Sequence, residues 1–235
     1  LVQRFIQEAK TMAKLNHENI VSVHDFGQHD GEYYFTMDLI DGQELKHHLK
    51  DLKPRQAMVW MLKICDAIEY IHNLGIIHRD LKPSNVMIGS DGPVLMDFGI
   101  ARDDLRESQL TKTGSSLGTP SYMSPEQARG LTDQIDERSD IYGLGAMVYE
   151  MLTSRPPFIG NAMQLLYKIC TTKPESVQNY NPSIPKDVVV IVEKAMEKEK
   201  SLRYESVEEM KSDIKRYLDG LKIHAKPPSA FMQLK

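Results

Sequence analysis

Residues 78–85 read HRDLKPSN, and residues 97–99 read DFG. Each motif alone is weak support for a function, since a short polar sequence between two strands also arises by chance. The segment between them holds two short apolar runs, at 86–88 and 94–96, around the turn-forming sequence GSDGP. When both motifs occur in this order and are joined by a predicted hairpin, they indicate two neighbouring turns whose polar side chains serve a single functional site.

The residue types in these motifs suit phosphoryl transfer. This reaction needs little covalent help, so a protein must place a base beside the attacking hydroxyl and hold metal ions against the phosphates. Asp80 is the candidate base, and Lys82 is the candidate cation that stabilises the transferring group. Asn85 and Asp97 are the candidate Mg²⁺ ligands, because Mg²⁺ takes only a few oxygen ligands from protein.

With these motifs the chain resembles the C-terminal two-thirds of a eukaryotic-like protein kinase domain. The sequence YMSPEQ at 122–127 is similar to bacterial members in particular. The resemblance implies an α+β, protein-kinase-like fold, with a mostly helical C-terminal lobe and a truncated N-lobe of one helix and a two-stranded hairpin. It implies a partial N-lobe at 1–40, a C-lobe at 41–220 and a linker or tail at 221–235. It also implies ATP and Mg²⁺ as cofactors, and serine or threonine hydroxyls of proteins as acceptors.

The same resemblance places a nucleotide pocket. Met37 is expected at the back of the pocket, and the backbone of Asp38 and Ile40 is expected to form the hinge that bonds adenine. Met87 is expected to form the floor beneath adenine. Glu44 falls where the family contacts the ribose or a basic substrate residue, and a solvated glutamate at a helix start is the alternative.

Regulatory positions are expected on the first helix and at 100–126, whose Gly, Ser and Thr content is typical of a mobile loop with a function. Glu8 aligns with the ion-pair glutamate of the kinase regulatory helix, and an exposed helix charge is the alternative. Thr111 and Thr113 are the favoured phosphate acceptors, since bacterial members often phosphorylate threonines with this spacing. Arg79 is expected to clamp such a phosphate with a bidentate pair. A plain flexible loop is the alternative.

Four further residues take their roles from the resemblance. Thr119 indicates the substrate class, because a threonine here clusters with the catalytic aspartate and lysine in kinases that act on serine and threonine. Asp140 is expected to bond the backbone of the catalytic loop, and Arg203 is expected to pair with Glu126. These roles are structural, since a buried charge needs partners of this kind to persist.

Apolar periodicity predicts the main elements. Residues 54–73 predict a long buried helix with proline in its first turn and Gly75 at its end. The β-branched and aromatic runs at 20–26 and 32–38 predict a hairpin. Further helices are predicted at 136–152, 162–170, 188–196 and 207–218.

Composition narrows the class of protein. The 235 residues are 41% hydrophobic, which is enough for a substantial core. A net charge of −4 with no basic stripe argues against a nucleic-acid binder. Cys65 and Cys170 lack partners at metal-ligand spacing and predict reduced thiols, hence a cytoplasmic location. We expect no membrane span and no signal peptide within these residues, and an anchor outside them is compatible with this expectation.

The 235 residues contain neither the glycine-rich phosphate loop nor the strand lysine that the resemblance would lead us to expect ahead of the first helix. We therefore expect a fragment, or a late-starting version, of an active kinase, since all the candidate catalytic residues of the large lobe are present. The alternative is a catalytically inactive kinase-fold module that binds proteins near residues 155–170.

Overall fold

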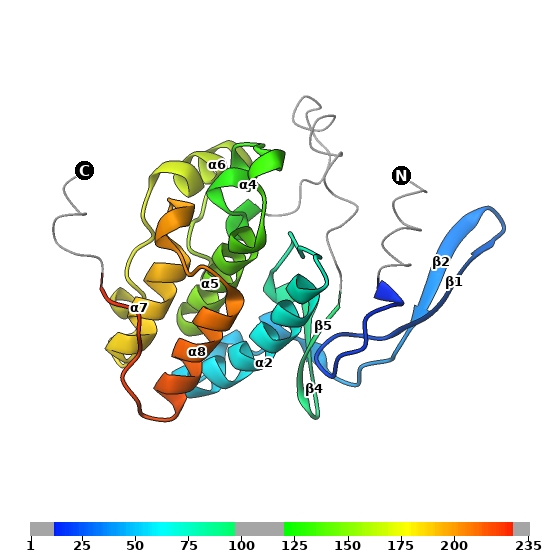
Figure 1. Ribbon diagram of the computed structural model, residues 1–235, viewed down its shortest axis with the longest axis horizontal. Coiled ribbons are helices and arrows are strands. Elements are labelled where there is room, and N and C mark those ends of the chain that lie inside the picture. The colour runs from blue at the N-terminus through cyan, green and yellow to red at the C-terminus, as the bar shows by residue number, and fades with distance from the viewer. Residues whose placement is uncertain (1–11, 97–119, 228–235) are drawn as a thin grey trace.

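The computed structural model describes residues 12–96 and 120–227. The strands are β1 (Val23–His29), β2 (Glu32–Met37), β3 (Gln43–Glu44), β4 (Val86–Gly89) and β5 (Gly92–Leu95). The helices are α2 (Pro54–Asn73), α4 (Pro125–Ala128), α5 (Glu137–Thr153), α6 (Ala162–Thr171), α7 (Lys186–Ala195) and α8 (Val207–Leu218). Figure 1 shows the helices gathered in one lobe and the β1–β2 hairpin projecting away from it, with β4 and β5 between them.

The core of the helical lobe lies where α2 and α5 pack against α7 and α8. α2 begins at Pro54, whose missing N–H is not needed in a first turn, and it ends before Gly75, which has a φ of +72°. α5 is buried around most of its circumference. At Gly145 a Cβ would lie 2.8 Å from the Cβ of Ala195, so the absent side chain lets α5 approach the end of α7. In the two described ranges, no helix is long and apolar enough to cross a bilayer.

The predicted hairpin is present, but its turn is tighter than the sequence suggested. β1 continues to His29, so Gly27 and Gln28 lie in the strand rather than in the turn. Asp30 and Gly31 alone form the turn, with φ values of +50° and +86°. Two consecutive positive φ angles are the geometry that joins strands with the natural right-handed twist, so this dipeptide is sufficient and the glycine at 27 is not required for turning.

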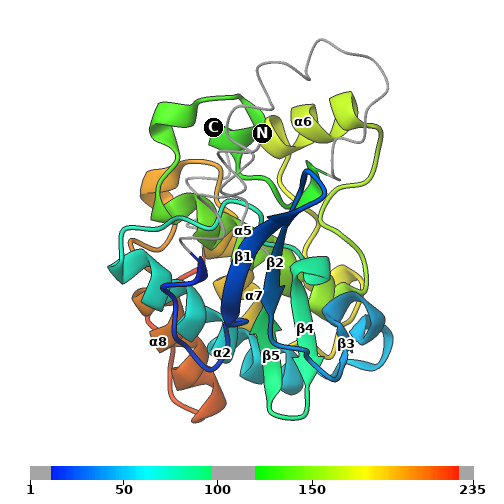
Figure 2. The ribbon, with the colours of Figure 1, turned by 90° about the vertical axis from the view of Figure 1, so that its right-hand side faces the viewer.

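The three-stranded sheet has the order β3-β4-β5, and Figure 2 shows these strands side by side beneath the hairpin. Residues 19–21 run along the open edge of β5. The N–H of Val21 donates to the Leu95 carbonyl at 2.9 Å, and the N–H of Leu95 donates to the Asn19 carbonyl at 2.8 Å. The described part of the predicted N-lobe at 1–40 thus shares one core with the large lobe, and most of its predicted helix lies outside the described residues.

The predicted tail at 221–235 contributes two residues to the core. Ile223 and Ala225 are buried, and the carboxylate of Asp213 on α8 accepts the backbone N–H groups of His224 at 2.6 Å and Ala225 at 2.9 Å. Residues 223–225 are therefore attached to α8, and part of the predicted linker or tail at 221–235 lies outside the described residues.

Candidate active site

The loop between α2 and β4 is tied to α5 by one carboxylate. Asp140 is only 2% exposed, and it accepts the backbone N–H groups of His78 and Arg79, each at 2.8 Å. The Nε2 of His72 on α2 donates to the same carboxylate at 2.8 Å. Asp140 thereby fixes the entry to the loop, where Arg79 has a left-handed φ of +68° that is uncommon for a residue other than glycine.

Asp80, Lys82 and Asn85 converge on the next turn of this loop. The Nζ of Lys82 lies 2.8 Å from Oδ2 of Asp80. The Nδ2 of Asn85 donates to the same oxygen at 3.0 Å and to the Asp80 backbone carbonyl at 2.9 Å. Asn85 is buried at the end of a short 3₁₀ turn, so a rigid amide and a cation together orient one partly exposed carboxylate.

The residues predicted for the nucleotide pocket lie at the end of β2, directly after it, and in the paired strands β3 and β4. Met37 is the last residue of β2, and Asp38 and Ile40 come directly after it. Glu44 in β3 lies opposite Met87 in β4. The structure thus places β3, which follows the predicted hinge segment, beside β4, the strand that leads out of the Asp80 loop (Figure 2).

Gly42 permits this close approach. A Cβ at this position would lie 2.1 Å from the carbonyl oxygen of Ile88, which is an impossible contact. Two residues later, Glu44 forms a 2.5 Å ion pair with Lys46, and both side chains are partly exposed. The side chain of Glu44 therefore has a local partner at the rim of the predicted pocket.

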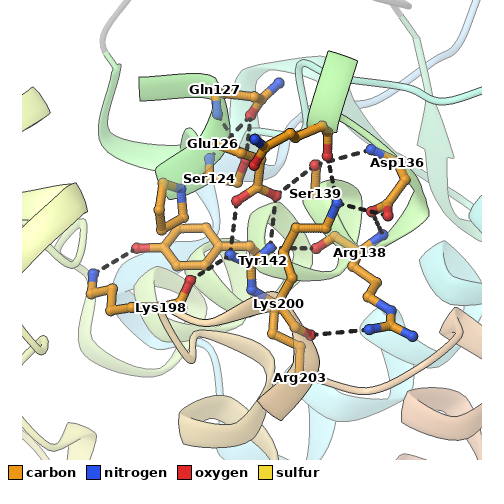
Figure 3. Close-up of polar contacts among 12 residues, drawn as sticks. Ser124, Glu126, Gln127, Asp136, Arg138, Ser139, Tyr142, Lys198, Lys200 and Arg203 are labelled. Atoms are coloured by element: carbon orange, nitrogen blue, oxygen red, sulfur yellow. Dashed lines mark hydrogen bonds and ion pairs between the residues drawn. The ribbon is translucent and has the colours of Figure 1, made fainter. Parts of the chain in front are cut away.

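The pair predicted between Glu126 and Arg203 is present and buried (Figure 3). Arg203 donates to the two carboxylate oxygens at 2.8 and 2.9 Å, and the Ser139 hydroxyl donates to Oε1 at 2.6 Å. Burial alone would raise the pKa of Glu126, but the hydrogen bonds and charge of Arg203 and the Ser139 hydroxyl lower it to about 2. This contact fixes α4 to the segment before α8.

Several predicted residues lie outside the described ranges. They are Glu8, Asp97, Thr111, Thr113 and Thr119. The second metal ligand, the threonine that indicates substrate class and the regulatory positions therefore stay predictions.

Of the two predicted Mg²⁺ ligands, Asn85 lies within the described ranges and Asp97 does not. Across 12–96 and 120–227, no group of three or more His, Cys, Asp or Glu side chains gathers as a metal site. Asn85 uses its Nδ2 on Asp80, which leaves Oδ1 as the atom of this side chain able to bind a cation. An amide oxygen such as this one is a ligand type that Mg²⁺ accepts alongside water and phosphate oxygens.

Sequence reasoning missed two residues that support the loop. His72 lies in the predicted helix at 54–73 with no role assigned to it, yet it bonds Asp140. Gln127 was not singled out, yet its Nε2 donates to the Arg79 carbonyl at 2.9 Å. The spacing of Ser124 and Gln127 matches a capping box, which signals the start of α4 but not this second contact.

The profile of the protein kinase domain family matches residues 2–214. The chain belongs to the protein kinase domain family. PrkC of Bacillus subtilis, a serine/threonine-protein kinase, is 39% identical over 230 residues, which cover 96% of this kinase domain and 35% of PrkC. The chain spans about a third of the length of the curated relatives it matches, such as PrkC.

Two solved structures have the same fold. A mutant of the PknI kinase domain of Mycobacterium tuberculosis has a TM-score of 0.71 and 25% identity, covering 92% of this kinase domain and 77% of that chain. Rad53 in complex with AMP-PNP has a TM-score of 0.73 and 25% identity, covering 88% and 53% of the two chains. The predicted kinase-like α+β fold and the resemblance to bacterial serine/threonine kinases are confirmed.

Proposed function

We propose that this kinase domain transfers the γ-phosphate of ATP to serine or threonine hydroxyls of protein substrates. The observation that carries the proposal is the convergence of Lys82 and Asn85 on the carboxylate of Asp80, at 2.8 and 3.0 Å. The name of PrkC supports the serine/threonine class, and AMP-PNP in the related Rad53 complex supports an adenine nucleotide.

In this proposal Asp80 accepts the proton of the attacking hydroxyl, and its two neighbours keep the carboxylate in one orientation. Lys82 adds positive charge where the transferring group becomes most negative. Asn85 and Asp97 would hold Mg²⁺. When bound, Mg²⁺ neutralises phosphate charge.

The remaining predicted residues bind or regulate. The backbone of Asp38 and Ile40 would bond adenine, with Met37 behind it and Met87 beneath it, and Glu44 would lie near the ribose.

Regulation is assigned to residues outside the described ranges together with Arg79. Phosphate on Thr111 or Thr113 would pair with the guanidinium of Arg79, and Glu8 would form the ion pair of the regulatory helix. Thr119 would join a hydrogen-bonded cluster with Asp80 and Lys82, as in kinases that act on serine and threonine.

The test compares two matched substitutions in the full-length gene product that carries this chain. Phosphate transfer from γ-labelled ATP to a protein substrate is measured for the wild type, Asp80→Asn and Asp133→Asn. Asp133 lies on an exposed turn, so the same chemical change is made away from the site. We expect Asp80→Asn to slow transfer by about 10²-fold or more, the usual contribution of a general base, and Asp133→Asn to stay within about twofold.

Three results would contradict the proposal: no transfer by the wild type, equal transfer by Asp80→Asn, or product in which phosphotyrosine predominates. A wild type that binds a protein substrate without any transfer would instead favour the inactive binding module.

A further inference from the structure

The peptide bond that precedes Asp80 is held at both of its polar ends. Its N–H, from Asp80, donates to Nδ1 of His78 at 3.3 Å. Its C=O, from Arg79, accepts the Nε2 of Gln127 at 2.9 Å. Because the plane of this peptide sets the direction in which the Asp80 side chain leaves the backbone, the two bonds together control where the carboxylate lies.

This part of the loop needs such bonds. Arg79 has a φ of +68°, and a residue with a side chain keeps this conformation only where its surroundings over-determine it. A small cavity of about 20 Å³ borders Arg79, Asp80, Leu81 and Gln127, so packing against the loop is incomplete on that side. The bond that the Arg79 N–H donates to Asp140 and the bond that Gln127 donates to the Arg79 carbonyl therefore define the backbone here.

Gln127 is itself fixed in one orientation. It is 6% exposed, and its Oε1 accepts the backbone N–H of Ser124 at 3.0 Å in the capping box of α4 (Figure 3). With its oxygen used by the cap, its amide nitrogen is the end directed to Arg79. The neighbouring Glu126–Arg203 pair anchors α4, so Gln127 connects a rigid support to the Asp80 loop.

We propose that Gln127 is a positioning residue for Asp80, acting through the carbonyl of Arg79. The inference rests on the proposed function, in which Asp80 is the base. It requires a side chain that accepts from the cap and also donates to the loop. Glutamine does both, whereas glutamate serves a capping box equally well but lacks the donor when ionised.

This difference separates positioning from simple helix capping. Gln127→Glu keeps the acceptor for Ser124 and places an oxygen against the Arg79 carbonyl. Gln178→Glu is the matched control, because the Nε2 of Gln178 donates to the Ile184 carbonyl at 2.8 Å, away from the site. Both variants thus lose one amide-to-carbonyl bond by the same chemical change.

Steady-state kinetics are measured on the full-length gene product, together with the wild type and Asp80→Asn. We expect Gln127→Glu to lower kcat by about tenfold or more while KM for ATP changes less than about threefold, since the lost bond serves the reacting carboxylate. Gln178→Glu is expected to keep kcat within about twofold of the wild type. Hydrogen exchange on the 235-residue chain should show faster exchange of the Asp80 amide in Gln127→Glu only.

The outcomes separate the two proposals. An inactive wild type, or an Asp80→Asn variant as active as the wild type, refutes the proposed function, and hydrogen exchange then still decides whether Gln127 holds the loop. An active wild type with Gln127→Glu within twofold of its kcat refutes the positioning role, as does an equal kcat loss in Gln178→Glu. If calorimetry shows that Gln127→Glu does not fold, Gln127→Met is measured instead. Because methionine also removes the acceptor for Ser124, a loss of kcat supports the positioning role only together with faster exchange of the Asp80 amide, and an unchanged kcat or unchanged exchange refutes it.

Discussion

Replacing Arg203 with methionine would remove the guanidinium that joins three parts of the helical lobe. Arg203 is 2% exposed and donates to Glu126 through two nitrogens. It also donates to the backbone carbonyls of Arg138, Glu197 and Lys198 at 2.9, 2.8 and 3.1 Å. Methionine fills much of the same volume but satisfies none of these acceptors.

Two estimates of the cost agree. Removing one partner of a buried ion pair destabilises a protein by about 3–5 kcal/mol. The pKa of Glu126, lowered from 4.5 to about 2, corresponds to about 3 kcal/mol of stabilisation at neutral pH. At about 2–4 °C per kcal/mol for a chain of this size, the melting temperature should fall by roughly 10 °C.

Urea and thermal unfolding of the 235-residue chain measure this cost. Lys211→Met is the control, because Lys211 pairs with Asp66 and Glu69 at partly exposed positions, so its loss should cost less than the loss of the fully buried Arg203. The stabilisation of Glu126 is present above pH 4.5 and is lost as the pH falls towards 2, so the gap between wild type and Arg203→Met should narrow between pH 5 and pH 3. A loss below about 1 kcal/mol at pH 7, or a gap independent of pH, would refute this reasoning.

Three further predictions concern Gly42, Tyr122 and the two cysteines. Gly42→Ala should destabilise the chain by more than about 1 kcal/mol in urea, since its methyl group would meet the Ile88 carbonyl, and an unchanged midpoint would contradict this contact. Burial raises the pKa of Glu150, and the hydrogen bond from the Tyr122 hydroxyl lowers it. Tyr122→Phe removes this bond to the ionised carboxylate, so it should lose more stability at pH 8, where the carboxyl must ionise, than at pH 4. Equal losses at the two pH values would count against this prediction. Burial also raises the pKa of the Cys65 thiol, so iodoacetamide should label the partly exposed Cys170 first in the native chain, and peptide mapping that finds equal rates would disprove this order.

The elements that local sequence determines were predicted well. The helix at 54–73 has the predicted bounds, because proline at its start and glycine at its end act within one turn. The hairpin turn was misplaced, since Gly27 suggests a turn when read by itself, although Asp30 and Gly31 already supply both positive φ angles. Asp80, Lys82 and Asn85 lie within six residues, so their convergence follows from one short loop.

Contacts between distant segments were beyond the sequence alone. The Glu126–Arg203 pair joins residues 77 apart and was expected only through family resemblance. In the sequence, His72 fits the pattern of a helix, and Gln127 fits the pattern of a helix cap. Neither pattern indicates that His72 bonds Asp140 or that Gln127 bonds the Arg79 carbonyl. A side chain with two polar ends can serve a local pattern with one end and a tertiary contact with the other, and spacing reports only the first.

The edge contact of residues 19–21 with β5 restricts how the hairpin can move. Its other end is fixed as well, because Gly42 lies against the backbone of β4. Between these two attachments, the N–H of Asp38 donates to the Ser22 carbonyl at 3.0 Å. The segment that leads into β1 and the segment that leaves β2 are therefore bonded to each other. Any tilting of β1 and β2 against the helices would therefore pivot about these two connecting segments. The outgoing segment contains Asp38 and Ile40, whose backbone is proposed to bond adenine.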